Sequence, residues 1–295
     1  MKKNPESSPP AFSRLRRIEG RHNPLVKKLR QAFSQAEPTE SRECAIEGLR
    51  ILEEAIRSAL RFSAVFFRES ALALAERLLP QIGSHVETLL LPDNLFDSAV
   101  PSESPQGVAA LVHLKSFTLE DVMERLQLGP VVVIAGLQDP GNLGTIVRSA
   151  EAFGSAGMLL GHGTVSPFNP KAVRASAGSI FRLPIVPNQD TKKTGPSPPS
   201  AASLHAALQK LRENKVRLLA TSSHKGTSID QADLKAPCAI LFGNEGAGLP
   251  RDLMAATHGT IAIPHHQQVE SLNAGVAASI VLYEAARQRK TAPSS

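Results

Sequence analysis

Three short polar segments combine amide, guanidinium, carboxylate and hydroxyl side chains, and each follows an apolar run typical of a strand. They are Asp139–Ser149, Gly243–Pro250 and Ile263–Asn273. Strand ends on one edge of an open α/β sheet converge, so the segments are expected to form one pocket. Such groups can clamp an anion or stabilise negative charge developing on an oxygen. The candidate catalytic residues are Asn142, Arg148, Glu245, Ser271 and Asn273.

The first segment combines a buried helix face with a free arginine. After the apolar run Val131–Ala135 and a Gly/Asp/Pro turn, a helix is predicted over Asn142–Phe153. Arg148 lies roughly 140° around this helix from Leu143, at about 100° per residue, outside the apolar stripe. The stripe itself consists of Leu143, Ile146, Val147, Ala150 and Phe153.

The second segment is rich in glycine, at Gly243, Gly246 and Gly248. Glycine lets the backbone adopt a positive φ and approach a ligand closely. The order G-x-x-G-x-G matches neither a dinucleotide fingerprint nor a P-loop, and an ordinary strand-to-helix turn remains an alternative. Glu245 could cap the following helix or clamp a cation such as Arg148.

In the third segment Ser271 is predicted to cap a helix over Ser271–Gln288, or to serve the site. Asn273 then falls in the first turn, where capping does not explain it. His265 and His266 are not predicted to bind metal, because adjacent histidines point apart and no third ligand has suitable spacing. No nucleophile-elbow serine or paired carboxylates indicate hydrolysis.

Composition restricts the class of protein. The 295 residues suit one large or two ordinary domains, and no apolar run of about 18 residues predicts a membrane helix. The N-terminus is basic but lacks the apolar core of a secretory signal. Cys44 and Cys238 have no metal-ligand spacing and are interpreted as reduced thiols. We therefore expect a cytoplasmic protein without a metal or a membrane partner.

Positive charge gathers at the N-terminus. Residues 1–30 hold nine basic and two acidic side chains, whereas the whole chain has a formal charge of +6, so the remainder is nearly neutral. Such a patch suits a polyphosphate such as RNA, with a solvated tail as the alternative. The candidate RNA-binding residues are Arg14, Arg16, Arg17, Arg21, Lys27, Lys28 and Arg30.

The pattern of elements predicts an α/β protein with two domains. Residues 1–20 are expected to form a basic flexible arm, 21–114 a small α/β domain that includes a helix over Gly48–Phe62, and 115–129 a linker with a helix over Lys115–Leu128. Strands and helices alternate through 130–295, with strands expected at 131–135, 181–186 and 239–242 among others. This alternation predicts a mainly parallel sheet with helices on both faces. The segment 188–203, rich in Pro, Ser and Lys, is predicted to be a mobile surface loop.

Over Val131–Gln288 the three segments resemble, in order and spacing, the three motifs of the SpoU/TrmH class of SPOUT RNA ribose 2′-O-methyltransferases. The N-terminal stretches NPLVKKLRQAF, AIEGLRILEEAI and SPQGVAALV resemble the substrate-binding domain of the same family, which makes 21–114 a candidate RNA substrate-binding domain. The matching motif residues are Asn142 and Arg148; Gly243, Glu245, Gly246 and Gly248; and Ile263, Pro264, Ser271, Leu272 and Asn273.

The resemblance implies a C-terminal trefoil knot, a homodimer, and a pocket for S-adenosylmethionine near the subunit interface. The implied acceptor is a ribose 2′-hydroxyl in structured RNA. Arg148 would fix the adjacent phosphate and stabilise the 2′-oxygen, and Glu245 would orient Arg148. Asn142 would hold the first turn or the ribose, and Ser271 and Asn273 would position the nucleotide. The implied cofactor-binding residues are Gly243, Asn244, Gly246, Ile263, Pro264, Leu272 and Thr221.

The chain departs from the family pattern at His265 and Gln267, where Met and Gly are common. The two-domain layout favours 23S rRNA, with a guanosine acceptor, over tRNA. A non-catalytic RNA-binding or ribosome-assembly protein on the same fold is a further alternative. A nucleotide-dependent oxidoreductase is disfavoured, because DPGNLG lacks the G-x-G-x-x-G order after the first strand of the domain.

Overall fold

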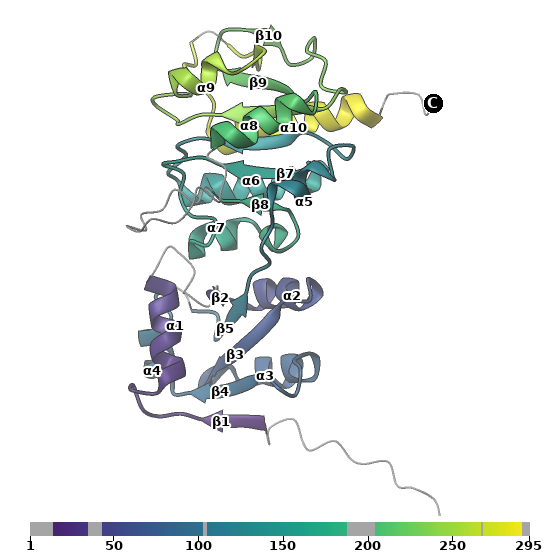
Figure 1. The fold of residues 1–295 in the computed structure, drawn as a ribbon. Coiled ribbons are helices and arrows are strands. Elements are labelled where there is room, and N and C mark those ends of the chain that lie inside the picture. Colours follow the sequence, from purple (N-terminus) through teal and green to yellow (C-terminus); the bar gives the residue numbers. More distant parts are fainter. Residues whose placement is uncertain (1–13, 35–42, 103–104, 188–203, 267, 291–295) are drawn as a thin grey trace, which may run out of the picture. The chain divides into compact units, whose positions relative to one another are not determined.

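The computed structural model describes residues 14–34, 43–102, 105–187, 204–266 and 268–290. The chain forms two compact units that divide between Lys115 and Ser116 (Figure 1). The predicted loop 188–203 and most of the predicted arm lie outside the described residues. Among the helices in the described ranges, none has the length and apolarity needed to cross a membrane.

The N-terminal unit is built on a mixed five-stranded sheet in the order β1-β4-β3-β5-β2. Strands β1, β4 and β3 run parallel, whereas β5 pairs antiparallel with both β3 and β2. The strands are β1 (Leu15–Arg17), β2 (Glu43–Glu47), β3 (Arg61–Arg68), β4 (Glu87–Leu91) and β5 (Val108–His113).

Helices cover both faces of this sheet. On one face α1 (Pro24–Ser34) and α4 (Asp93–Ala99) share a core with Phe66 of β3. Alternate strand residues point to opposite faces. Phe67 therefore faces the other side, where α2 (Leu49–Arg57) and α3 (Leu72–Leu78) contact the strands. Short 3-10 turns, η2 (Glu69–Ala71) and η3 (Leu79–Gln81), flank α3.

The C-terminal unit contains a seven-stranded sheet in the order β10-β12-β9-β11-β6-β7-β8. Every neighbouring pair in it is parallel. The predicted α/β class with a mainly parallel sheet is therefore confirmed. The strands are β6 (Val131–Ile134), β7 (Gly157–Leu160), β8 (Ile185–Val186), β9 (Arg217–Ser222), β10 (Thr227–Ser228), β11 (Cys238–Phe242) and β12 (Gly259–Ala262).

The two faces of this sheet pack against different helices. Val131 and Val133 of β6 share a core with α5 (Leu119–Met123), α8 (Leu204–Glu213) and α9 (Arg251–Ala255). Val132 and Ile134 alternate with them and are also fully buried. The remaining helices pack together, with α6 between the other two; they are α6 (Pro140–Ala152), α7 (Pro170–Ala175) and α10 (Ala274–Lys290).

Helices α6 and α7 approach each other at a glycine. A Cβ atom on Gly144 would lie 2.5 Å from the Ala172 carbonyl oxygen and 2.5 Å from the Ala175 Cβ atom. Any larger side chain would push the two helices apart. The position of α6, which carries Asn142 and Arg148, therefore depends on Gly144.

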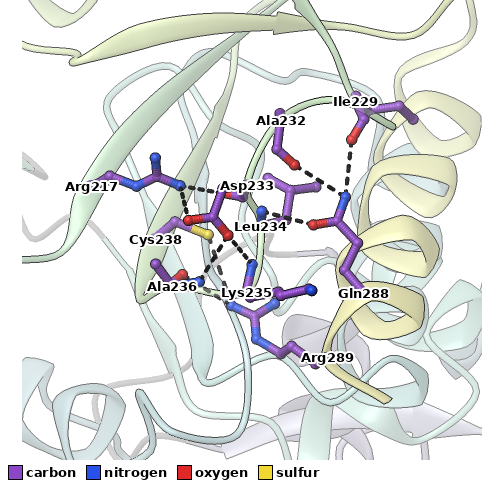
Figure 2. A network of polar contacts seen from close by, with 10 residues as sticks. All are labelled: Arg217, Ile229, Ala232, Asp233, Leu234, Lys235, Ala236, Cys238, Gln288 and Arg289. Carbon is purple, nitrogen blue, oxygen red and sulfur yellow. Dashed lines mark hydrogen bonds and ion pairs between the residues drawn. The ribbon is translucent and has the colours of Figure 1, made fainter. Parts of the chain in front are cut away.

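The C-terminal end of α10 is fixed by a buried polar network (Figure 2). The Gln288 amide accepts from the Leu234 backbone N–H at 2.9 Å and donates to the Ile229 and Ala232 carbonyls at 3.2 and 3.1 Å. Arg289 donates to the Ala236 carbonyl at 3.4 Å. This network ties α10 to the segment that leads into β11.

Several sequence predictions were wrong in detail. Residues 15–17, expected in a flexible arm, form β1, and the Arg14 guanidinium donates to the Leu79, Ile82 and Gly83 carbonyls. The helix predicted over Gly48–Phe62 ends at Arg57, because Ala59 adopts a positive φ of 51° and turns the chain into β3.

Two further elements are shorter than predicted. The strand expected over 181–186 is reduced to β8, preceded by the 3-10 turn η4 (Ser179–Phe181), since Pro184 has no N–H to donate to a sheet. The linker helix expected over 115–128 is reduced to α5, which begins at a capping box between Thr118 and Asp121.

Candidate functional site

The first turn of α6 presents Asn142. The Asp139 side chain caps the helix by accepting from the Asn142 backbone N–H at 2.6 Å, and Pro140 occupies the first helical position. The helix therefore begins two residues before the predicted start. This cap fixes the backbone of Asn142 and leaves its side-chain amide free to bond elsewhere.

The Asn142 side chain joins the three predicted segments. Its amide nitrogen donates to the Glu245 carboxylate, and its amide oxygen accepts from the Asn273 amide at 3.0 Å. Asn142 lies on α6, Glu245 follows β11, and Asn273 directly precedes α10. The structure thus brings these three candidate residues together, as expected if the segments that follow the strands meet at one edge of the sheet.

The loop after β11 is closed tightly by its glycines. A Cβ atom on Gly243 would lie 2.3 Å from the Gly248 carbonyl carbon, and Gly248 adopts a φ of +69°. The Asn244 side chain accepts from the Gly246 and Ala247 backbone N–H groups and donates to the Gly136 carbonyl at 2.8 Å. Asn244 therefore braces the loop with both ends of its amide, and Glu245 sits on the tightened turn.

A cavity of about 350 Å³ opens beside this loop. That volume lies in the range of small-molecule sites, about 300–1,000 Å³. Pro264 lines a neighbouring cavity instead. The predicted residues that do line this one are Thr221, Gly243, Asn244, Glu245, Gly246, Ile263, Ser271 and Leu272.

Part of the cavity wall was not anticipated from the sequence. Met254 of α9, Val281 of α10 and His265 also line it. Met254 and Val281 are helix residues whose periodicity indicates packing but not which cavity they face. His265 was considered as a metal ligand and as a departure from the family pattern, and its place three residues after β12 was the available signal that it could line the cavity.

Arg148 stands apart from these contacts within one chain. Its side chain is exposed on α6, and it forms no hydrogen bond or ion pair with the described part of the chain. The expected clamp of Arg148 by Glu245 is not seen there, because the Glu245 carboxylate accepts from Asn142 instead. Arg148 is also not among the residues that line the cavity.

The predicted cap of the last helix was wrong. Helix α10 begins at Ala274, and the Asn273 side chain accepts from the Val276 backbone N–H at 3.2 Å. Asn273 thus caps α10 and donates to Asn142 with the other end of its amide. Ser271, the predicted cap, lies two residues earlier as an exposed residue of the cavity wall.

Most side chains of the predicted basic patch bond within the N-terminal unit, and three of the seven pair with carboxylates. Arg16 pairs with Glu87, Arg17 with Glu69, and Lys28 with the buried Glu43. Arg30 donates to the Ser98 carbonyl, as Arg14 does to those near η3. Of the seven predicted residues, Arg21 and Lys27 form no hydrogen bond or ion pair within the described ranges.

Neither cysteine shows features of a reactive thiol. Both Cys44 and Cys238 are buried and unpaired. Burial, with the adjacent Glu43 charge, raises the pKa of Cys44 to about 12, and burial also raises the pKa of Cys238. Among the residues described, no group of three His, Cys, Asp or Glu side chains is arranged to hold a metal ion.

Comparison with known proteins identifies both units. Residues 129–283 match the model of the SpoU rRNA methylase family, and residues 23–110 match the MRM3-like substrate-binding domain. An uncharacterised tRNA/rRNA methyltransferase of Synechocystis is 33% identical over 95% of this chain and 97% of its own length. The 23S rRNA (guanosine(2553)-2′-O)-methyltransferase RlmP of Bacillus subtilis is 28% identical over 91% of this chain and 98% of its own.

Solved structures agree with the sequence relatives. The SpoU methyltransferase AviRb from Streptomyces viridochromogenes, in complex with AdoMet, superposes with a TM-score of 0.76 at 26% identity, covering 92% of this chain and all of that one. An AdoMet-bound rRNA methyltransferase from Sinorhizobium meliloti gives a TM-score of 0.76 at 27% identity, covering 93% and 98%. The chain therefore belongs to the SpoU rRNA methylase family, and the prediction of an RNA methyltransferase is confirmed.

Proposed function

We propose that the protein methylates a ribose 2′-hydroxyl in 23S rRNA, with S-adenosylmethionine as donor and a guanosine as acceptor. The observation that carries this proposal is the hydrogen-bonded line Asn273–Asn142–Glu245 beside the cavity, which unites the three segments. The guanosine-directed name of the Bacillus relative supports the choice of nucleotide. An rRNA substrate implies that the enzyme acts in the cytoplasm.

The cavity suits the methyl donor. The backbones of Gly243, Ile263 and Leu272, all of which line the cavity, would hold its adenosine part. Apolar side chains of Ile261 and Met254 in the wall suit a purine ring. Thr221, whose hydroxyl donates to the Leu241 carbonyl at 2.9 Å, completes that wall.

The reaction needs alignment and charge stabilisation. When bound, S-adenosylmethionine supplies an electrophilic methyl group. Asn142, fixed between Glu245 and Asn273, orients the acceptor ribose, and Ser271 on the cavity wall bonds the nucleotide. The guanidinium of Arg148 stays protonated, so it fixes the neighbouring phosphate and stabilises negative charge on the 2′-oxygen rather than taking its proton.

The active form is proposed to be a homodimer. Val276, Ile280 and Tyr283 form an exposed stripe on α10, with 49, 36 and 55% of each residue accessible. Phe153 extends it, in edge-on contact with Tyr283 at 5.7 Å between ring centroids. Aromatic and aliphatic side chains grouped in this way are typical of a subunit interface. Arg148 is exposed on α6, the helix that packs against α10, and a second copy seated on the stripe is proposed to enclose it.

A trefoil knot belongs to the same proposal. Strand β12 returns between β9 and β10, after which the chain runs through the third motif into α10 beside α6. This return of late strands into the middle of the sheet supports a threaded C-terminus. Knots are rare, and the family resemblance is what makes one expected here.

Residues 21–114 are proposed to form the domain that binds the RNA substrate. Residues 115–129 are proposed to be the linker, and residues 130–295 the domain that catalyses methyl transfer. The match of residues 23–110 to a substrate-binding domain supports the first assignment. Arg21 and Lys27 are the predicted cations without an internal partner in the described residues, and they are proposed to contact phosphates. The other five predicted cations already have partners, so each would contact a phosphate only by sharing or leaving its present partner. They are Arg14, Arg16, Arg17, Lys28 and Arg30.

The test is a comparison of 2′-O-methylation across total RNA from cells with and without the gene. One 23S rRNA guanosine should lose its methyl group, and the purified enzyme with S-adenosylmethionine should restore it. Loss of a tRNA ribose methyl group instead would favour the tRNA alternative. Unchanged RNA, with no heat on titrating S-adenosylmethionine, would favour a non-catalytic RNA-binding protein.

A further inference from the structure

We propose that His265 is a positioning residue for S-adenosylmethionine, which holds the third-motif loop in its binding shape. The inference rests on the proposed use of this donor. His265 lies three residues after β12, following Ile263 and Pro264, and this half-buried residue lines both the donor cavity and the neighbouring one. The residue therefore forms part of the partition between the two cavities.

Both ring nitrogens of His265 meet backbone carbonyl oxygens of its own loop. Nδ1 lies 2.7 Å from the Ile263 oxygen and Nε2 lies 3.1 Å from the Val269 oxygen. A carbonyl oxygen can only accept, so the neutral ring donates to one of them and the protonated ring to both. The His265 side chain thus links the backbone of Ile263, at the end of the strand, to that of Val269. These two contacts hold the loop in a closed turn.

A second contact joins this loop to the one after β9. The His224 and His265 rings stack with centroids 4.9 Å apart and planes inclined by 33°. Ser222 and Ser223, which precede His224, line the donor cavity. His265 therefore connects two loops that contribute to the same cavity wall. Loss of its side chain would loosen both loops and leave the contacts of α6 in place.

His266 offers a matched control. It is adjacent in sequence and chemically identical, but its side chain is exposed and forms no hydrogen bond or ion pair with the described part of the chain. Its backbone oxygen accepts from the Val269 N–H at 3.0 Å, a contact that substitution of the side chain leaves in place. A general effect of altering this loop would therefore appear in both variants.

The test measures the Kd for S-adenosylmethionine by titration calorimetry and kcat at saturating donor in the full-length protein. His265→Ala should raise that Kd about tenfold, the effect of roughly 1.4 kcal/mol, which is the size of one or two hydrogen bonds. Its kcat at saturating donor and its KM for RNA should stay within about twofold, since the residue acts through the loop. His266→Ala should match the wild type.

Two conservative variants separate the ring contacts. His265→Asn places an amide near the position of Nδ1 and His265→Gln near that of Nε2, so one of them should recover part of the lost affinity. An unchanged Kd in His265→Ala, or an equal rise in His266→Ala, would overturn the inference. A lower kcat at unchanged Kd would overturn it too. A wild-type protein that does not bind the donor would instead refute the proposed function.

Discussion

Asn142 and Glu245 are 103 residues apart in the chain and share a hydrogen bond at the edge of the cavity. The bond places the first turn of α6 against the glycine loop after β11. Because Asn273 donates to the same Asn142 amide, one side chain fixes the relative position of all three motifs. A change at Asn142 should therefore affect the site as a unit.

A double-mutant cycle tests this coupling. Asn142→Ala and Glu245→Ala are each expected to lower kcat/KM for RNA at least about tenfold, and the double variant should be little worse than either. Both single changes break the same bridge, so the coupling free energy should be about 1–2 kcal/mol. Asn214→Ala, at the end of α8, serves as the control. Fully additive losses would show that the two residues act independently.

Arg148 should contribute to turnover and not to donor binding. Arg148→Ala is expected to lower kcat by more than about 100-fold, because it removes charge stabilisation at the reacting oxygen. The Kd for S-adenosylmethionine should stay within about twofold, since Arg148 is not a cavity residue. Arg148→Lys asks whether charge alone suffices. Arg212→Ala, an exposed arginine of α8, is the control, and unchanged turnover in Arg148→Ala would remove this residue from the mechanism.

The motifs could be located from the sequence, but their contacts could not. Polar groups that follow apolar runs predicted that Asn142, Glu245 and Asn273 would meet, since parallel strands end at one edge of a sheet. The same reasoning paired Glu245 with Arg148, because opposite charges attract and helix phase is known only approximately. In the structure the Asn142 amide donates a hydrogen bond to the Glu245 carboxylate, whereas Arg148 lies on another side of α6.

The accuracy of the predicted helix and strand boundaries was limited by local backbone geometry and strand pairing, which hydrophobic periodicity does not report. The apolar pattern of Gly48–Phe62 continues past Arg57, yet a positive φ at Ala59 ends the helix. Residues 15–17 are too few and too polar to predict a strand, and β1 forms because β4 offers a free edge for pairing. The fully buried strands β6 and β11 were predicted to within one residue at each end, since burial on both faces gives an unbroken apolar run.

Acid should weaken the anchor between α6 and the turn η4. Arg182 donates to both oxygens of Glu151, at 2.6 and 2.9 Å. Burial acts to raise the pKa of Glu151, but hydrogen bonds from Arg182 and Ser179 outweigh it, so the pKa lies below its ordinary value. A carboxylate with a depressed pKa in the folded state stabilises the fold above its unfolded pKa, about 4.3, and loses this effect as pH falls.

Glu151→Gln should therefore lower the free energy of unfolding by about 1 kcal/mol at pH 7, after allowance for partial exposure of the pair. The difference from wild type should shrink as pH falls through the folded-state pKa of Glu151, because a protonated Glu151 side chain is uncharged, as the Gln side chain is. The single tyrosine, Tyr283, lies in the same unit, so its fluorescence can follow unfolding in urea. Asp252→Asn, in an exposed pair with His205 of the same unit, is the control. A difference that persists at low pH would contradict this assignment.

Gln288 should matter more for stability than its position near the C-terminus suggests. Gln288→Ala leaves the Leu234 N–H and the Ile229 and Ala232 carbonyls without this partner in a largely buried setting (Figure 2). The expected loss is about 2 kcal/mol of unfolding free energy. Gln209→Ala, on the exposed face of α8, should change stability by less than about 0.5 kcal/mol. Equal effects of the two substitutions would argue against an anchoring role.

The apolar stripe of α10 should hold two copies together. Ile280→Asp places a charge at its centre, and burying an unpaired carboxylate is costly, so sedimentation at micromolar concentration should show a monomer where the wild type is a dimer. Leu128→Asp alters the most exposed large apolar residue found in the described chain, at 58%, away from the stripe, and should leave the dimer intact. Because Arg148 is proposed to act at this interface, the monomer should also lose turnover while the donor cavity stays whole. A monomeric wild type with full activity would refute both the interface and the shared site.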